Sequence, residues 1–190
     1  MQVNASVLRA TRGIAVGETS VYYVPQQEQR WIGRELEAAQ QFWTLGVFLV
    51  TPDDWAYQEI ERFKREGRPL PPWRHTFSFA SMGIGGLGQW DPVPNSISEQ
   101  SCPFCGEDIT DAMYEVWVEE NPVPLPERSL SCPHCSKAVQ AGAGVASEAF
   151  VFSRFYLWVS DIDEGDWQPD FQQTVEQVLG PCNVFQSWET

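Results

Sequence analysis

Four of the five cysteines stand in two short motifs that could bind a metal or exchange electrons. Cys102-Pro-Phe-Cys105 and Cys132-Pro-His-Cys135 share the pattern C-P-x-C, and a serine precedes each of them. A single C-x-x-C is typical both of a thiol redox pair and of half a zinc site. A structural zinc ion takes four ligands in a tetrahedron, and each such turn offers two thiolates. The paired motifs therefore favour a metal site, and the odd number of cysteines argues against a disulfide framework.

Residues 98–137 resemble a zinc ribbon, a family in which two cysteine turns are joined by a β-hairpin. The resemblance implies that the chain binds one structural Zn2+ ion. The 26 residues between Cys105 and Cys132 exceed the spacing of roughly 15–20 that is usual in ribbons. A Pro-rich segment, residues 119–128, accounts for the excess length. The ligands that the resemblance implies are Cys102, Cys105, Cys132 and Cys135.

A thiol redox protein stays open as an alternative function. The redox cysteines of the thioredoxin fold open a long helix, whereas Cys135 is followed by the short, glycine-containing segment SKAVQAGAG. The sequence therefore favours zinc over redox chemistry.

The negative charge of the chain is concentrated in its second half. Residues 1–97 carry ten acids and nine bases, whereas residues 98–190 carry sixteen acids and three bases, giving net charges of −1 and −13. Such a field repels phosphate backbones and attracts basic protein surfaces. We therefore expect a basic protein partner, as for an acidic inhibitor or immunity-type protein, and we expect no nucleic acid or membrane as ligand. A zinc-ribbon adaptor in transcription or translation machinery is the alternative.

The segment DIDEGDWQPD, residues 161–170, is the most acidic stretch of the chain. It does not fit a calcium-binding loop, because Gly165 takes the fifth position, where a ligand is needed, and Gln172 the twelfth. Two interpretations stay open: a solvated acidic loop before a helix N-terminus, which the helix dipole favours, and a docking surface for a basic partner. The residues predicted to bind this partner are Asp161, Asp163, Glu164, Asp166 and Trp167.

Neither nucleotide binding nor catalysis has a convincing motif. The glycines of GIGGLG, residues 83–88, match G-x-G-x-x-G, but Pro92 and Pro94 forbid the helix whose N-terminus would hold a pyrophosphate. The two histidines, His75 and His134, stand in a Pro-rich segment and inside a cysteine turn. We expect a protein that is not an enzyme.

Hydrophobic periodicity predicts an α+β fold, with a sheet and helices packed on one of its faces. Asp54-Trp55 and Asp166-Trp167 occupy similar places in two strand–helix–strand units, which suggests an internal duplication. Strands are expected at residues 5–13, 19–26, 44–50, 74–81, 154–163 and 182–188, and helices at 27–41, 51–67 and 166–180.

The change in composition near residue 98 predicts a module inserted into a parent domain. The parent α+β domain comprises residues 1–97 plus 141–190, and the zinc-ribbon-like module comprises residues 98–140. The N-terminus shows no basic start followed by an apolar run, and the apolar stretches are too short to span a bilayer. A cytoplasmic location is expected.

Overall fold

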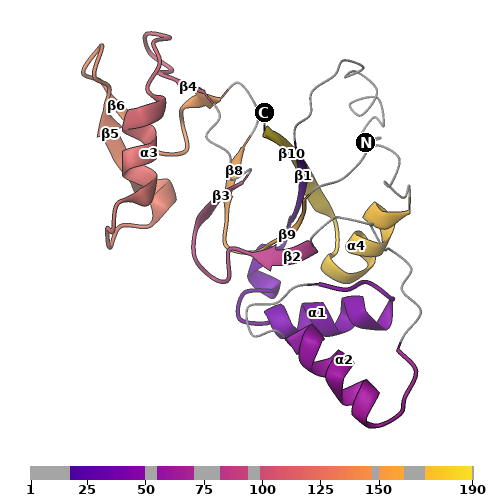
Figure 1. Cartoon of the computed structure of the whole chain (residues 1–190). Coiled ribbons are helices and arrows are strands. Elements are labelled where there is room, and N and C mark those ends of the chain that lie inside the picture. The colour runs from indigo at the N-terminus through magenta and orange to yellow at the C-terminus, as the bar shows by residue number, and fades with distance from the viewer. Residues whose placement is uncertain are drawn as a thin grey trace.

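A four-stranded antiparallel sheet forms the centre of the molecule (Figure 1). The computed structural model describes residues 18–49, 55–70, 82–93, 99–146, 150–160 and 170–189. The predicted α+β fold is confirmed. The sheet has the order β10 (Cys182–Glu189), β1 (Glu18–Pro25), β9 (Tyr156–Val159) and β2 (Met82–Gly85).

Two helices cover one face of this sheet and bury its main core. α1 (Glu35–Thr44) and α4 (Phe171–Leu179) pack against each other and on the strands. α4 turns Phe171, Val175 and Val178 inward, as its spacing predicts. Trp31 is fully buried, and its indole N–H donates to the carbonyl of Leu179, at the end of α4, at 3.2 Å.

The connections give two strand–helix–strand units, β1–α1–β2 and β9–α4–β10, whose strands interleave in the sheet. This strand order is that of the split β-α-β (ferredoxin-like) arrangement. The counterpart of α4 is therefore α1, which shares its core. The predicted correspondence instead used the helix at 51–67, and its markers Asp54, Asp166 and Trp167 lie outside the described residues.

The region between β1 and β2 differs from the predicted pattern in two places. The helix expected at 27–41 is divided into η2 (Glu28–Arg30) and α1, because Gly33 adopts φ +72° between them. The strand expected at 44–50 is absent from its described residues 44–49. Instead α1 ends in a Schellman motif, in which Gly46 has φ +78° and the Val47 N–H donates to the Phe42 carbonyl at 2.9 Å.

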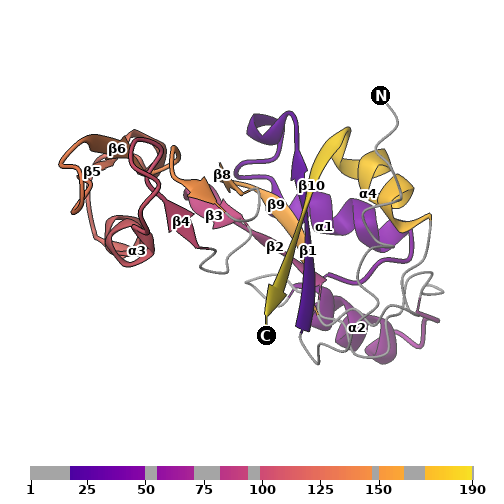
Figure 2. The ribbon, with the colours of Figure 1, turned by 90° about the horizontal axis from the view of Figure 1, so that it is seen from above.

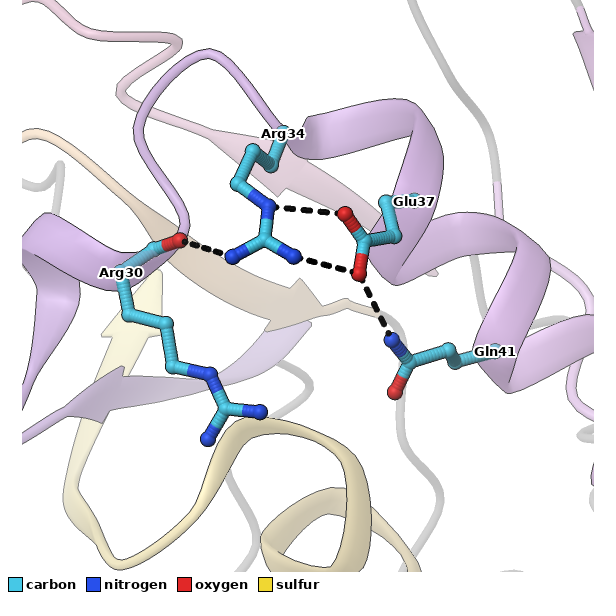
Figure 3. Close-up of polar contacts among 4 residues, drawn as sticks. All are labelled: Arg30, Arg34, Glu37 and Gln41. Carbon is cyan, nitrogen blue, oxygen red and sulfur yellow. Dashed lines mark hydrogen bonds and ion pairs between the residues drawn. The ribbon is translucent and has the colours of Figure 1, made fainter.

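A bidentate ion pair holds the start of α1 against η2 (Figure 3). The Arg34 guanidinium donates to both carboxylate oxygens of Glu37, at 2.7 and 2.6 Å, and to the Arg30 carbonyl at 3.3 Å. Gln41 donates to the same carboxylate at 3.3 Å. Because the pair is exposed, it contributes little to stability, and the contact that joins η2 to the helix is the hydrogen bond to the Arg30 carbonyl.

α2 (Trp55–Arg65) forms a separate layer beyond α1 (Figure 1). Its Ala56 and Phe63 pack with Trp43 of α1 in a small aromatic cluster. The predicted stop at Gly67 is confirmed, since this residue has φ +63° and the Arg68 N–H donates to the Phe63 carbonyl at 2.9 Å. None of the helices in the described parts of the chain has the length and apolar character needed to cross a bilayer.

The second face of the sheet is covered by a two-stranded ribbon, β3 (Asp91–Val93) with β8 (Val151–Ser153). Val93 and Val151 pack there against aromatic side chains of the sheet, among them Tyr156. The Tyr156 hydroxyl donates to Asp91 at 2.5 Å. Burial, together with this hydrogen bond to the Asp91 carboxylate, raises the pKa of Tyr156, so the phenol stays protonated.

The glycines of GIGGLG are explained by these aromatic rings. Gly83 and Gly85 belong to β2, and a Cβ at either position would collide with the ring of Trp158 or Tyr156, respectively. Gly86 adopts φ +77° in the following turn. A strand and not a helix follows, so this segment lacks the helix N-terminus that binds a pyrophosphate.

The cysteine turns lie at one end of the molecule, away from α1, α2 and α4 (Figures 1 and 2). Their segment connects β3 to β8, and β4 pairs with β7 where it begins and ends. The division into residues 98–140 and residues 1–97 plus 141–190 stays a prediction. The elements of this end are β4 (Gln100–Ser101), α3 (Thr110–Val118), η3 (Leu125–Glu127), β5 (Ser129–Ser131), β6 (Ala138–Gln140) and β7 (Val145–Ala146).

Gly83→Ala should destabilise the fold. The added Cβ would lie 2.6 Å from Cζ2 of Trp158, so the free energy of unfolding should fall by about 1–3 kcal/mol in urea denaturation. In a Trp158→Leu background the same change should cost less, because the obstructing ring is gone. An equal cost in both backgrounds would show that the ring contact is not the reason for the glycine.

Candidate metal centre

The two C-P-x-C motifs fold into nearly identical tight turns. In the first, the Cys102 N–H donates to the Glu107 carbonyl at 2.8 Å, and the Gly106 N–H returns to the Cys102 carbonyl at 2.8 Å. The second turn closes the β5–β6 hairpin. Its equivalent bonds run from the Cys132 N–H to the Lys137 carbonyl, 2.9 Å, and from the Ser136 N–H to the Cys132 carbonyl, 2.9 Å.

The four sulfur atoms of these turns converge on one point. All of them lie within 4.8 Å of one another. Cys102 Sγ is 3.8 Å from Cys135 Sγ, and Cys105 Sγ is 3.8 Å from Cys132 Sγ. A tetrahedron of thiolates at a metal–sulfur distance of about 2.3 Å has edges of about 3.8 Å. The described residues therefore include a four-cysteine group that could hold a metal ion.

The first cysteine of each turn is buried and the second is more open. Cys102 and Cys132 belong to a small core with Met113 of α3 and Val139 of β6, whereas Cys105 is exposed. The sulfur group therefore lies at the edge of this core, closed on one side by apolar side chains and open to solvent on the other.

Backbone N–H groups prepare the buried sulfurs for negative charge. Burial raises the pKa of the Cys102 thiol, but hydrogen bonds from the N–H groups of Phe104 and Cys105 and from neighbouring thiols outweigh it and lower the pKa to about 7. The Phe104 N–H lies 3.5 Å from this sulfur. Around Cys132, burial is likewise outweighed by the N–H groups of Cys135 and His134, which lower its pKa. Metal binding requires deprotonation of all four thiols, and the backbone already lowers the pKa of these two.

The pKa of the exposed thiol, that of Cys105, is shifted in the opposite direction. The N–H of Glu107 lowers the pKa of Cys105, but desolvation and the three neighbouring sulfurs outweigh it, and the pKa is raised to about 12. Ionisation of one thiol thus opposes ionisation of the next, because like charges lie close together.

His134 holds the two turns together but does not belong to the sulfur group. Its Nε2 lies 3.1 Å from the carbonyl oxygen of Asp108, beyond the first turn. Lys137 of the second turn makes a parallel contact, with its Nζ 4.8 Å from the ring centroid of Phe104. Both contacts join one turn to the other on the solvent side.

The resemblance implies that a β-hairpin joins the two turns. In the structure residues 110–118 of this connection form helix α3 instead. The Asp108 carboxylate starts this helix by accepting hydrogen bonds from the Thr110 N–H, at 2.9 Å, and from its hydroxyl, at 2.6 Å. These bonds lower the pKa of Asp108. Met113, Val116 and Trp117 then face the small core at helical spacing.

Arg128 is a structural residue that the sequence analysis missed. Its guanidinium donates to four backbone carbonyls, those of Val116 (2.8 Å), Glu119 (2.7 Å), Asn121 (3.0 Å) and Val123 (2.8 Å). It thereby caps the C-terminus of α3 and fixes the Pro-rich segment. A lone arginine at the end of an acidic, proline-rich stretch was the available signal.

The structure brings all four predicted metal ligands together. The predicted partner-binding residues Asp161, Asp163, Glu164, Asp166 and Trp167 lie outside the described residues, so their role stays a prediction. His75 also lies outside them. Cys182, the fifth cysteine, packs against the sheet core instead.

Comparison of the chain with protein-family models, curated proteins and solved structures finds no match in any of the three. The assignment of the metal centre therefore rests on its own geometry. The four-cysteine group is compatible with a zinc-ribbon-like site.

A matched pair of substitutions tests the geometry of the turns. Gly106 and Ser136 occupy the same position in the two turns, with φ +77° and φ +59°. Since this region costs a non-glycine residue roughly 1–2 kcal/mol, Ser136→Gly should raise the free energy of unfolding by about 1 kcal/mol. Gly106→Ala should lower it by a similar amount, since no atom lies near its added Cβ. Urea unfolding of the metal-loaded protein measures both, and a destabilising Ser136→Gly would contradict the equivalence of the turns.

Proposed function

We propose that the chain is a non-enzymatic zinc protein, in which one Zn2+ ion holds an acidic module that binds a basic protein partner. The observation that carries the metal assignment is the convergence of four cysteine sulfurs at tetrahedral spacing. Four thiolates fill the coordination shell of zinc and leave no open position for a substrate. The metal would therefore stabilise the fold and not take part in a reaction. Thiolate ligands fit a reducing compartment such as the cytoplasm.

The sulfur contacts support a metal site over a thiol redox pair. The 3.8 Å contacts pair Cys102 with Cys135 and Cys105 with Cys132, so each joins one turn to the other. A C-x-x-C redox centre needs only the two sulfurs of one turn. The convergence of both turns therefore supports a site in which all four sulfurs share one ion.

The charge of the module supports a basic protein partner over nucleic acid. Residues 99–146 contain eight acids and two bases, Arg128 and Lys137. Arg128 is occupied by backbone carbonyls, and the Lys137 ammonium lies over Phe104. Four thiolates around a divalent ion add two further negative charges. A phosphate backbone would find no basic stripe here, which weighs against the adaptor alternative.

Metal analysis of the purified protein should find one zinc ion per chain. Cys102→Ser should abolish stoichiometric zinc and remove the hydrogen-exchange protection of residues 99–146, because metal binding and folding of such a site are coupled. His134→Ala is the matched control, since its imidazole lies outside the sulfur group, and it should retain the zinc. Iron in place of zinc, a metal-free chain, or loss of zinc from His134→Ala would each contradict the assignment.

The partner class can be tested with defined peptides. A panel of synthetic peptides of one length should bind the zinc-loaded chain in order of positive charge, and the affinity should fall as sodium chloride is added. Neutralising Asp161, Asp163, Glu164 and Asp166 together to Asn or Gln should weaken this binding if the predicted loop takes part. Binding of a single-stranded DNA oligonucleotide in preference to the peptides would instead favour the adaptor alternative.

A further inference from the structure

We propose that the outward face of α3 is the surface that receives this basic partner. The inference rests on the proposed function and names the surface through which it would operate. On this face Tyr114 and Val118 are 44% and 58% exposed. Residues four apart lie side by side on a helix, so the two side chains form one apolar patch.

The patch is not needed for the core of the module. α3 already buries Met113 and packs Val116 and Trp117 on the opposite side, against the buried cysteines and Val139. An isolated exposed apolar side chain is normal on a protein surface. Two adjacent ones on a helix that has already buried its apolar stripe leave a face without a partner in the described structure.

Carboxylates line one side of this patch. Asp111, Glu115 and Glu119 are exposed on α3 or in the residue that follows it. In the described part of the chain the ion pairs lie elsewhere, on α1, on and after α2, and between η2 and the residue after β8, and none involves these three acids. An apolar pair beside a stripe of unneutralised carboxylates is complementary to a protein surface that presents Arg or Lys next to an apolar side chain.

The same charge pattern argues against other occupants. In a second copy of the chain, two such faces would bring their carboxylates together. A phosphate backbone or an anionic lipid surface would be repelled for the same reason. The occupant we infer is therefore a basic protein segment with an apolar or aromatic anchor.

The face is also held rigid before any partner arrives. Asp108 fixes the first turn of α3, and Arg128 satisfies the carbonyls of Val116 and Glu119 at its end. Met113 ties the helix to the sulfur group. A preorganised surface loses little conformational entropy on binding, which favours affinity.

The decisive variant is Tyr114→Ser with Val118→Ser, tested in the full zinc-loaded chain. The probes are basic peptides that either contain or lack one aromatic residue. The double variant should bind the aromatic peptides at least about tenfold more weakly, because an apolar anchor is lost from the centre of the contact. Its zinc content and thermal unfolding should equal those of the wild type.

The matched control removes two comparably exposed apolar side chains elsewhere, Leu36→Ser with Val184→Ser, which are 41% and 42% exposed. It should retain the wild-type affinity. Should the α3 double variant lose zinc, Glu115→Lys with Glu119→Lys replaces it, since both residues are exposed, and it should repel the same peptides.

The outcomes separate this inference from the proposed function. If the α3 variants still bind the peptides, or if the control variant loses affinity equally, the proposed role of the α3 surface is wrong. The proposals of a zinc site and of a basic partner are unaffected by either result. Affinity that follows charge alone, with no gain from the aromatic residue, also overturns it. If the wild type binds none of the peptides, both the α3 surface and the basic-partner proposal are wrong.

Discussion

The proximity of four sulfur atoms is the constraint on which the cysteine-bearing end of the molecule depends. Four thiolates within 4.8 Å repel one another strongly, and without a cation only some of them ionise. This repulsion is seen in the pKa values, because the pKa of Cys102 is lowered while that of Cys105 is raised. A divalent metal ion removes the conflict, because its charge favours deprotonation of every ligand at once.

The core around these sulfurs is small, so a bound ion would add to its stability. It has six buried hydrophobic residues, and two of them are the cysteines Cys102 and Cys132. Apolar burial on this scale does not hold a segment of this length, and small modules are commonly stabilised by a metal. Arg128 and Asp108 satisfy the ends of α3, but their bonds lie within the segment between the turns and do not join one turn to the other.

Aromatic packing connects this end to the sheet. Trp117 of α3 contacts Phe152 of β8, with ring centroids 6.0 Å apart, and Phe150, at 5.4 Å. Next to Phe152, Val151 packs with the aromatic side chains on the second face of the sheet. Order in the sulfur group is thus linked through α3 and β8 to the main sheet, in contacts short enough to transmit a change of packing.

The sequence predicted the features that depend on local pattern. The cysteine pairs, β1, β9, β10, α2 and the buried face of α4 follow from spacing within single segments. The errors arose where distant contacts decide. Residues 44–49 are mostly apolar, which predicts a strand, yet Gly46 allows the helix to end there, and Val47 and Leu49 pack in the core beside the sheet. The four carbonyls that Arg128 gathers are likewise a property of the folded chain alone.

Helix α3 shows how one short sequence can serve two purposes. In MYEVWVE, residues 113–119, apolar and polar positions fit a strand nearly as well as a helix. The helix is favoured because Met113, Val116 and Trp117 then reach one core while Asp108 and Arg128 satisfy its ends. The same geometry turns Tyr114 and Val118 outward. A strand would also have placed Tyr114 and Val118 on one face, but it would have put Glu115 and Glu119 on the opposite face, so the apolar pair would have lost its acidic neighbours.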